Sequence, residues 1–224
     1  MAATTKAADH EQSVQVSIGP ISLEGNLGVP GNAPGVVLFA HGSGSSRHSP
    51  RNRYVAQALR QAGLATLLLD LLTIEEEAVD AHTAHLRFDI ELLAERLSAA
   101  TDWVNQAPST AGLPVGYFGA STGAGAALVA AAKRPDGVSA VVSRGGRPDL
   151  AGEALAQVRA PTLLIVGGED VPVIGMNREA LQQLGAREKQ LVIVPGASHL
   201  FEEPGTLEEV ARLATAWFTK YLTR

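Results

Sequence analysis

The stretch Pro114-Val-Gly-Tyr-Phe-Gly-Ala-Ser121-Thr-Gly123 decides the fold of this chain. Its first half, residues 114–118, is apolar and predicts a buried β-strand, and an Ala-rich helical pattern follows from Ala124. Residues 119–123 between them form a G-x-S-x-G pattern, in the strand, turn and helix context of a nucleophile elbow. Its small residues suit a strained turn, where bulk would collide with the neighbouring strand or helix. The pattern predicts a Ser121 hydroxyl raised at the carboxyl edge of a sheet, although alone it fits equally well a glycine-rich turn with an incidental serine.

Strand and helix patterns alternate on both sides of this turn. Two segments near the N-terminus alternate polar and apolar residues, which predicts an antiparallel pair at a sheet edge. The later apolar runs predict strands that are buried on both faces. The predicted strands are residues 14–18, 21–29, 35–40, 65–69, 114–118, 138–142, 162–166 and 191–194. The predicted helices are residues 54–62, 86–105, 124–133, 151–158, 178–184 and 207–222.

This alternation predicts an α/β fold, with a mostly parallel central sheet of about eight strands and helices on both faces. Its 224 residues contain no Pro/Gly/Ser-rich linker, so we expect one domain over residues 14–224 after a flexible tail over residues 1–13. Residues 74–85 have the least regular pattern. In such a sheet, ligands bind outside the carboxyl ends of the strands, which is where candidate site residues are sought.

The composition narrows the classes of function. The chain is 46% hydrophobic and 18% charged, with a net charge of −5, so it lacks the basic stripe of a protein that binds nucleic acid or an anionic membrane. It has no cysteine, which excludes disulfides, thiolate metal sites and a cysteine nucleophile. We expect a cytoplasmic protein with no metal, no other cofactor and no membrane span, because no apolar run approaches about 20 residues. A monomer and a homodimer both remain open.

A serine nucleophile needs a base and an acid that orients the base. In this type of fold they follow the serine in the order acid, then histidine, each in a loop after a later strand. Asp170 and His199 follow the last two predicted strands in that order, so we predict a Ser121, Asp170 and His199 triad. Glu169 is the alternative acid, and Asp170 could instead cap a helix.

The loop after the first central strand is the candidate oxyanion loop. Acyl transfer needs two N–H donors aimed at the developing oxyanion, and we assign them to the backbone of Ser43 and Thr122. Gly42 in the same loop is expected to contact the substrate. His41 precedes that glycine, which favours a role in shaping the loop over a role as catalytic base.

Two arginines follow the strand predicted at residues 138–142. Arginine binds carboxylate in a bidentate manner, so Arg144 is a candidate for binding an acidic group of the substrate. An ordinary loop ion pair is the alternative for both arginines, and it is favoured for Arg147, which has Asp149 close by in the sequence.

The chain resembles the α/β-hydrolase superfamily, and in particular its dienelactone-hydrolase-like branch, over nearly all of the sequence from Val14 onward. The motifs that carry the resemblance are His41-Gly42-Ser43-Gly44, the Ser121 elbow, Gly168-Glu169-Asp170 and Ser198-His199. The resemblance implies a fold without a large lid domain and hydrolysis of carboxylic esters. Dienelactone hydrolases proper carry a cysteine nucleophile where this chain has Ser121, so the resemblance does not extend to dienelactone cleavage.

These observations predict an esterase for small-molecule esters with small acyl groups. Ser121 would form the acyl-enzyme, His199 would act as general base and Asp170 would orient it. Two alternatives remain open: an acyltransferase or perhydrolase that uses the same triad, and a catalytically silent hydrolase fold that serves as a binding module.

Overall fold

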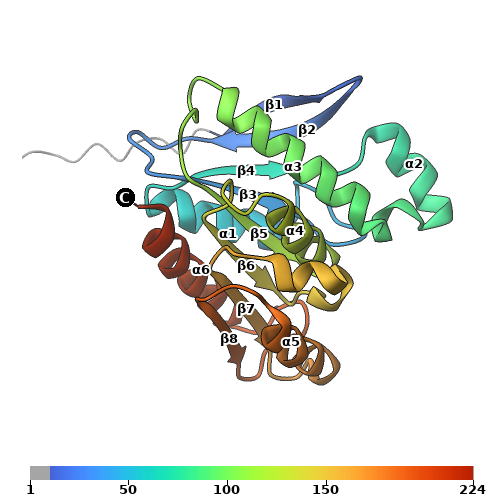
Figure 1. The fold of residues 1–224 in the computed structure, drawn as a ribbon, viewed down its shortest axis with the longest axis vertical. Coiled ribbons are helices and arrows are strands. Elements are labelled where there is room, and N and C mark those ends of the chain that lie inside the picture. Colours follow the sequence, from blue (N-terminus) through green and yellow to red (C-terminus); the bar gives the residue numbers. More distant parts are fainter. Residues whose placement is uncertain (1–10, 224) are drawn as a thin grey trace, which may run out of the picture.

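The computed structural model describes residues 11–223, which form one eight-stranded sheet with helices on both of its faces (Figure 1). The strand order is β1-β2-β4-β3-β5-β6-β7-β8. β1 pairs antiparallel with β2, and the sheet is mostly parallel, as predicted. β2 also pairs antiparallel with β4. The strands are β1 (Glu11–Ile18), β2 (Ile21–Gly28), β3 (Val36–Ala40), β4 (Ala65–Leu69), β5 (Val115–Ala120), β6 (Ala140–Arg144), β7 (Thr162–Gly167) and β8 (Lys189–Val194).

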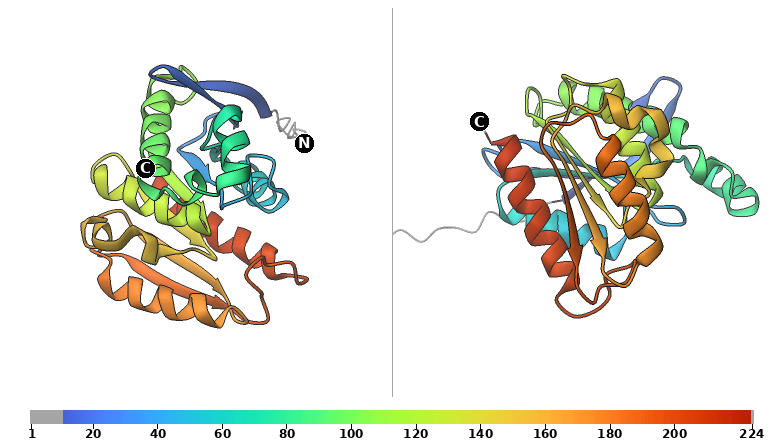
Figure 2. Two further views of the ribbon diagram at one scale, coloured as in Figure 1. Left: turned by 90° about the vertical axis from the view of Figure 1, so that its right-hand side faces the viewer. Right: turned by 60° about the horizontal axis from the view of Figure 1, so that its bottom comes forward.

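The helices cover the two faces of the sheet unequally (Figure 2). On one face, α1 and α6 pack over the central strands in a cluster that includes Phe39, Phe118 and Phe218. On the other face, α3, α4 and η2 pack in a larger cluster around Leu38 and Tyr117. The helices of the chain are α1 (Pro50–Gln61), α2 (Ile74–Thr83), η1 (Leu86–Phe88), α3 (Ile90–Gln106), α4 (Thr122–Lys133), η2 (Pro148–Gln157), α5 (Val171–Gln183) and α6 (Thr206–Leu222).

Cover on both faces explains the composition of the central strands. Every residue of β3, β4, β5, β6 and β7 is buried, which explains why these strands are mostly apolar. β1 lies at the edge of the sheet, and most of its residues are exposed or partly buried, whereas Val16 is buried. The parallel strands all end at one edge, and the loops with the candidate site residues follow there.

Residues 74–85, whose sequence pattern was the least regular, contain a helix that the pattern did not delimit. They begin with α2, a regular helix that lies to one side of the sheet (Figure 1). The side chain of Thr73 accepts a hydrogen bond from the N–H of Glu76, while the Glu76 carboxylate accepts one from the N–H of Thr73. This reciprocal cap satisfies two N–H groups of the first turn, so it stabilises a helix whose apolar pattern is weak.

Some predicted boundaries also change. The tail predicted at residues 1–13 is wrong for residues 11–13, which pair with β2, while residues 1–10 lie outside the described residues. The segment predicted as a helix at residues 151–158 lies mostly in η2, a 3-10 helix with a kink at Gly152. Between residues 11 and 223, no helix has the length and apolarity needed to cross a membrane.

Candidate active site

Ser121 lies in a sharp turn between β5 and α4. Its φ of 49° and ψ of −121° are unusual for a residue with a side chain, and backbone hydrogen bonds hold it in this conformation. The N–H of Ser121 donates to the carbonyl of Arg144, at 3.3 Å. Its carbonyl accepts from the N–H groups of Ala124, at 3.1 Å, and Arg147, at 3.0 Å. The turn is therefore fixed from both α4 and the loop after β6.

Glycines allow the surrounding backbone to approach this turn closely. A Cβ on Gly123 would lie 2.3 Å from the carbonyl oxygen of Ala40 and 2.4 Å from that of His41. A Cβ on Gly42 would lie 3.1 Å from the Cβ of Ser121. The first turn of α4 thus packs directly on the end of β3, and the loop after β3 lies beside Ser121.

His199 and Asp170 form a hydrogen-bonded pair at the same edge of the sheet. The Nδ1 atom of His199 lies 2.6 Å from Oδ2 of Asp170, whose side chain is 12% exposed. Asp170 stands at the N-terminus of α5, yet its side chain makes no capping hydrogen bond there. The carboxylate is thus used for the histidine, which leaves Nε2 as the free ring nitrogen. The alternative acid, Glu169, is exposed and has no hydrogen bond to His199 among the described residues.

The loop after β6 brings this pair close to Ser121. Gly145, at a φ of 51°, lies against the histidine: a Cβ built on it would be 3.1 Å from the carbonyl oxygen of His199 and 3.6 Å from Cε1 of its ring. Arg144, the preceding residue, binds the N–H of Ser121. No hydrogen bond joins the Ser121 hydroxyl to His199 within residues 11–223. In unliganded enzymes, this contact is often long and shortens when the substrate binds.

The loop after β3 is shaped by His41, which is buried. Nδ1 of His41 lies 3.0 Å from the carbonyl oxygen of Gly42, and Nε2 accepts a hydrogen bond from the N–H of Leu71, at 3.2 Å. Both ring nitrogens are therefore used within the scaffold. The N–H of Ser43 donates to the side-chain hydroxyl of Thr122, at 2.8 Å. This candidate oxyanion donor is thus bonded to a side chain of the protein itself, and the sequence did not reveal that bond.

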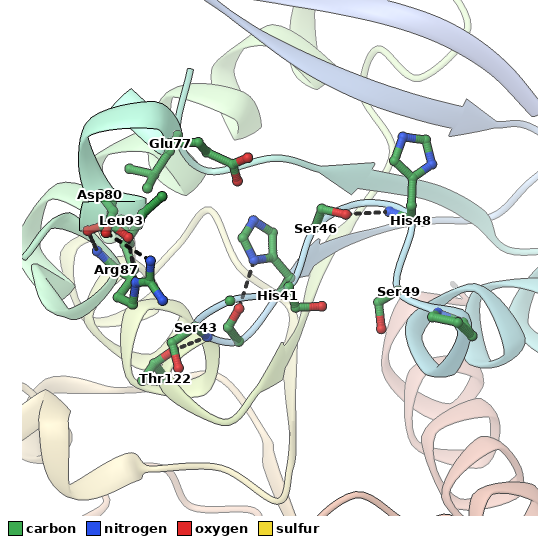
Figure 3. A pocket seen from close by; sticks show the side chains of 16 residues that line it. His41, Ser43, Ser46, His48, Ser49, Glu77, Asp80, Arg87, Leu93 and Thr122 are labelled. Atoms are coloured by element: carbon green, nitrogen blue, oxygen red, sulfur yellow. Dashed lines mark hydrogen bonds and ion pairs between the residues drawn. The ribbon is translucent and has the colours of Figure 1, made fainter. Parts of the chain in front are cut away.

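A cavity of about 500 Å³ opens beside this loop (Figure 3). The loop and Thr122 form one part of its wall, and residues of α2, η1 and α3 form another. Asp80 and Arg87 hold this second wall together, because Nε of Arg87 donates to the Asp80 carboxylate, at 2.5 Å. Leu72 and Leu93 add apolar lining. The cavity therefore lies next to the Ser121 turn and has both polar and apolar walls.

The structure separates the two arginines that the sequence offered as candidates. Arg147 donates to Asp149 from Nε, at 2.8 Å, and from Nη2, at 2.7 Å, which is the loop ion pair considered above. Arg144 is the last residue of β6 and is only 6% exposed. Its Nη2 donates to Oδ1 of Asn52, at 3.1 Å. The buried position of Arg144 is therefore more enclosed than the pocket-edge position that the sequence suggested.

Sequence reasoning missed two residues that support the site. Asn52, the partner of Arg144, lies 92 positions earlier in the chain and is 2% exposed, and no local pattern marks it. Glu203 accepts a hydrogen bond from the N–H of Ser198, at 3.0 Å, and so closes the loop that carries His199. That backbone hydrogen bond is the main reason why the pKa of Glu203 lies below its ordinary value. In the sequence, only the short distance of five residues between Ser198 and Glu203 could have indicated that the two residues interact.

Comparison with known proteins gives a consistent result for the fold. The model of the dienelactone hydrolase family matches residues 23–222. The crystal structure of dienelactone hydrolase from Anabaena variabilis ATCC 29413 is 67% identical, with a TM-score of 0.93, and the match covers 95% of this chain and 98% of that one. Est1E from Butyrivibrio proteoclasticus has a TM-score of 0.77 over 93% of this chain and 98% of its own, at 16% identity, which supports the α/β-hydrolase fold alone.

A curated relative from Mycobacterium tuberculosis (strain ATCC 25618 / H37Rv) bears a different kind of name, "Putative phosphoribosyl transferase". It is 61% identical over 212 residues, which make up 95% of this chain and 47% of the relative. The chain thus spans about half the length of the curated relatives that it matches most extensively.

Proposed function

Because this chain belongs to the dienelactone hydrolase family, we propose that it is a serine hydrolase that cleaves carboxylic esters of small acyl groups through an acyl-enzyme at Ser121. The family and the α/β-hydrolase fold support hydrolase activity in general. The ester substrate and the roles of individual residues are the proposal.

One observation carries this assignment: the hydrogen bond of 2.6 Å between His199 and Asp170, at the sheet edge where Ser121 occupies a strained turn. A serine hydroxyl is a weak nucleophile until a base takes its proton. A carboxylate on Nδ1 holds the imidazole in the tautomer whose Nε2 can accept that proton, and it stabilises the imidazolium that results.

The reaction would then follow from the positions of these groups. Ser121 attacks the ester carbonyl and passes its proton to His199, which returns it to the leaving alcohol. His199 next takes a proton from water, and the resulting hydroxide attacks the acyl carbon. As the bond to Ser121 breaks and the carboxylic acid leaves, His199 returns the proton to the Ser121 oxygen. Two backbone N–H groups, of Thr122 and Ser43, would stabilise the oxyanion in both steps. For Ser43 this requires the oxyanion to replace the Thr122 hydroxyl as acceptor.

The cavity beside Thr122 supports a small substrate. Its volume of about 500 Å³ lies within the usual range of small-molecule sites, and Gly42 leaves the loop close to Ser121. Its walls bear serine hydroxyls as well as Leu72 and Leu93, which suits an ester that is partly polar.

The name of the M. tuberculosis relative belongs to a protein of which this chain matches 47%, and we do not propose phosphoribosyl transfer for this chain. The Ser121, His199 and Asp170 arrangement suits attack on an acyl carbon and needs no sugar phosphate. Acyl transfer to an alcohol instead of water would use the same triad, and it would appear as ester exchange when an alcohol is added.

Hydrolysis of a chain-length series of p-nitrophenyl esters by wild type and Ser121→Ala tests the proposal. We expect the wild type to prefer short acyl chains and the variant to lose activity. Equal activity of the two proteins would overturn the role of Ser121, and inactivity of both toward all esters would favour a silent binding fold.

A further inference from the structure

Arg144 is a buried cation without a carboxylate partner. Its residue is 6% exposed, and within residues 11–223 no acidic side chain forms an ion pair with it. Nη2 donates to the neutral amide oxygen of Asn52, and the guanidinium carbon lies 5.9 Å from the centre of the Phe201 ring. Its Nε–H has no acceptor in the part of the chain that the structure describes. Neither Asn52 nor Phe201 supplies a negative charge.

The charged group nearest in effect to Arg144 is a second cation, Arg51, and not an acid. Burial first, and the nearby charge of Arg51 second, lower the pKa of Arg144 to about 10. At neutral pH, the guanidinium therefore still carries its charge. Among the described residues, the buried Nε–H of Arg51 also has no acceptor, and the ion pair of Arg51, of 3.1 Å, is with Glu202, whose side chain is 64% exposed. Within residues 11–223, Glu202 is thus the one acid that forms an ion pair with either of these two guanidinium groups, and it is solvated.

Burial of a cation without a counter-charge lowers the stability of the folded protein. An ion taken out of water loses several kcal/mol of hydration, which only a counter-charge and hydrogen bonds can offset. Arg144 has one neutral acceptor and one weak aromatic contact. The unused Nε–H groups of Arg144 and Arg51 offer donors of the kind that bind anions.

The site borders the proposed catalytic residues. The carbonyl of Arg144 holds the N–H of Ser121, and Phe201 follows His199 by two residues. Asn52 and Arg51 belong to the first turn of α1, which directly follows the oxyanion loop. An anion bound here would therefore sit among three loops at the functional edge of the sheet.

We propose that Arg144 and Arg51 bind a small, singly charged anion at this place. The anion is either free in solution, as bromide or formate would be, or a carboxylate group of the substrate. The small exposure of Arg144 favours the free anion, because a substrate group would have to pass between Asn52 and Phe201. The substrate alternative rests on the proposed esterase function, whereas the free anion does not.

Thermal unfolding at constant sodium concentration tests this proposal, with bromide or formate replacing gluconate, which is too large for an enclosed site. For the wild type, we expect Tm to rise by about 3 to 6 °C for each tenfold increase of the small anion above its Kd. Arg144→Gln, which keeps an amide donor for Asn52, should show no such rise, and Arg144→Lys should keep part of it. Arg147→Gln is the matched control, because Asp149 already neutralises that exposed arginine, and its response should equal the wild type's.

A second arm distinguishes the source of the anion. 4-Acetoxybenzoate and its methyl ester differ by one carboxylate, so their kcat/KM ratio reports whether the site binds a substrate group. A ratio that falls about 10- to 100-fold in Arg144→Gln, with little change for the neutral ester, would assign the anion to the substrate. If Ser121→Ala kept both esterase activities, the role of Ser121 in the proposed function would be overturned, whereas the anion response of Tm would be unaffected.

The proposal is overturned if the wild type responds to neither free anions nor the substrate carboxylate. It is also overturned if Arg144→Gln responds to both as the wild type does. Should Arg144→Gln fail to fold, Arg51→Gln should weaken the anion response, and bromide-soaked crystals of the wild type should show anomalous density beside Nε of Arg144. If neither effect were seen, the proposed anion site would be overturned.

Discussion

Gly123 offers a direct test of how the elbow is held. In Gly123→Ala the added methyl group would lie 2.3 Å from the carbonyl oxygen of Ala40 and 2.4 Å from that of His41. An ordinary contact begins at 3.4 Å, so the first turn of α4 and the end of β3 must separate by about 1 Å. Both partners are backbone atoms, and Ala40 belongs to a fully buried central strand. The movement must therefore be taken up by the turn that carries Ser121.

Two effects compete in this variant. Alanine is the better helix former by about 1 kcal/mol, whereas overpacking of this size costs about 1 to 3 kcal/mol. We expect a net loss of stability, with Tm lower by a few degrees. A misplacement of about 1 Å at the nucleophile should also lower kcat/KM for p-nitrophenyl acetate about 100-fold.

Gly175→Ala is the matched control, because this residue lies exposed in α5 and nothing stands within 4 Å of its added Cβ. It should gain up to about 1 kcal/mol of stability and keep full activity. Differential scanning fluorimetry and esterase assays of both variants measure the contrast. If Gly123→Ala kept the wild-type Tm and kcat/KM, the close packing described here would be refuted.

Two further variants test the hydrogen bonds that hold His199 and its loop in place. Asp170→Asn should lower kcat about 10²- to 10⁴-fold with little change in KM, because the amide cannot stabilise the imidazolium; a steady-state assay that finds near-normal kcat would exclude Asp170 as the orienting acid. Glu203 has a pKa below its ordinary value of 4.5, so its hydrogen bond with Ser198 contributes stability above that pH, and this contribution is lost as the pH falls through the lowered value. Tm of the wild type should thus exceed that of Glu203→Gln at pH 6, with the difference shrinking below pH 4.5, and a difference that stays constant with pH would contradict this reading.

Much of the fold could be predicted from the sequence, because strands that are buried on both faces consist of mostly apolar residues. The strands at residues 65–69 and 162–166 agree with β4 and β7 within one residue, since every position in them is apolar or a buried threonine. α2 could not be predicted in this way, because its stability comes from the capping pair of Thr73 and Glu76 and from few buried residues. Local hydrogen bonds outweigh the hydrophobic pattern there.

In the candidate site, too, the features set by the strand order could be predicted, whereas those set by side-chain packing could not. Asp170 and His199 could be placed together because the carboxyl ends of parallel strands share one edge, and the fold then sets their distance. The bond between Ser43 and the Thr122 hydroxyl depends on a side-chain rotamer, which sequence order does not specify. The enclosure of Arg144 likewise depends on Asn52, brought from another part of the chain by tertiary packing.

Covalent trapping shows whether Ser121 is the nucleophile. The wild type and Ser121→Ala would be incubated with a fluorophosphonate, digested and mapped by mass spectrometry. We expect one phosphonyl group on the peptide that contains Ser121 of the wild type, with parallel loss of esterase activity, and no label on the variant. Label at another residue, or esterase activity that survives full labelling of Ser121, would contradict that role of Ser121.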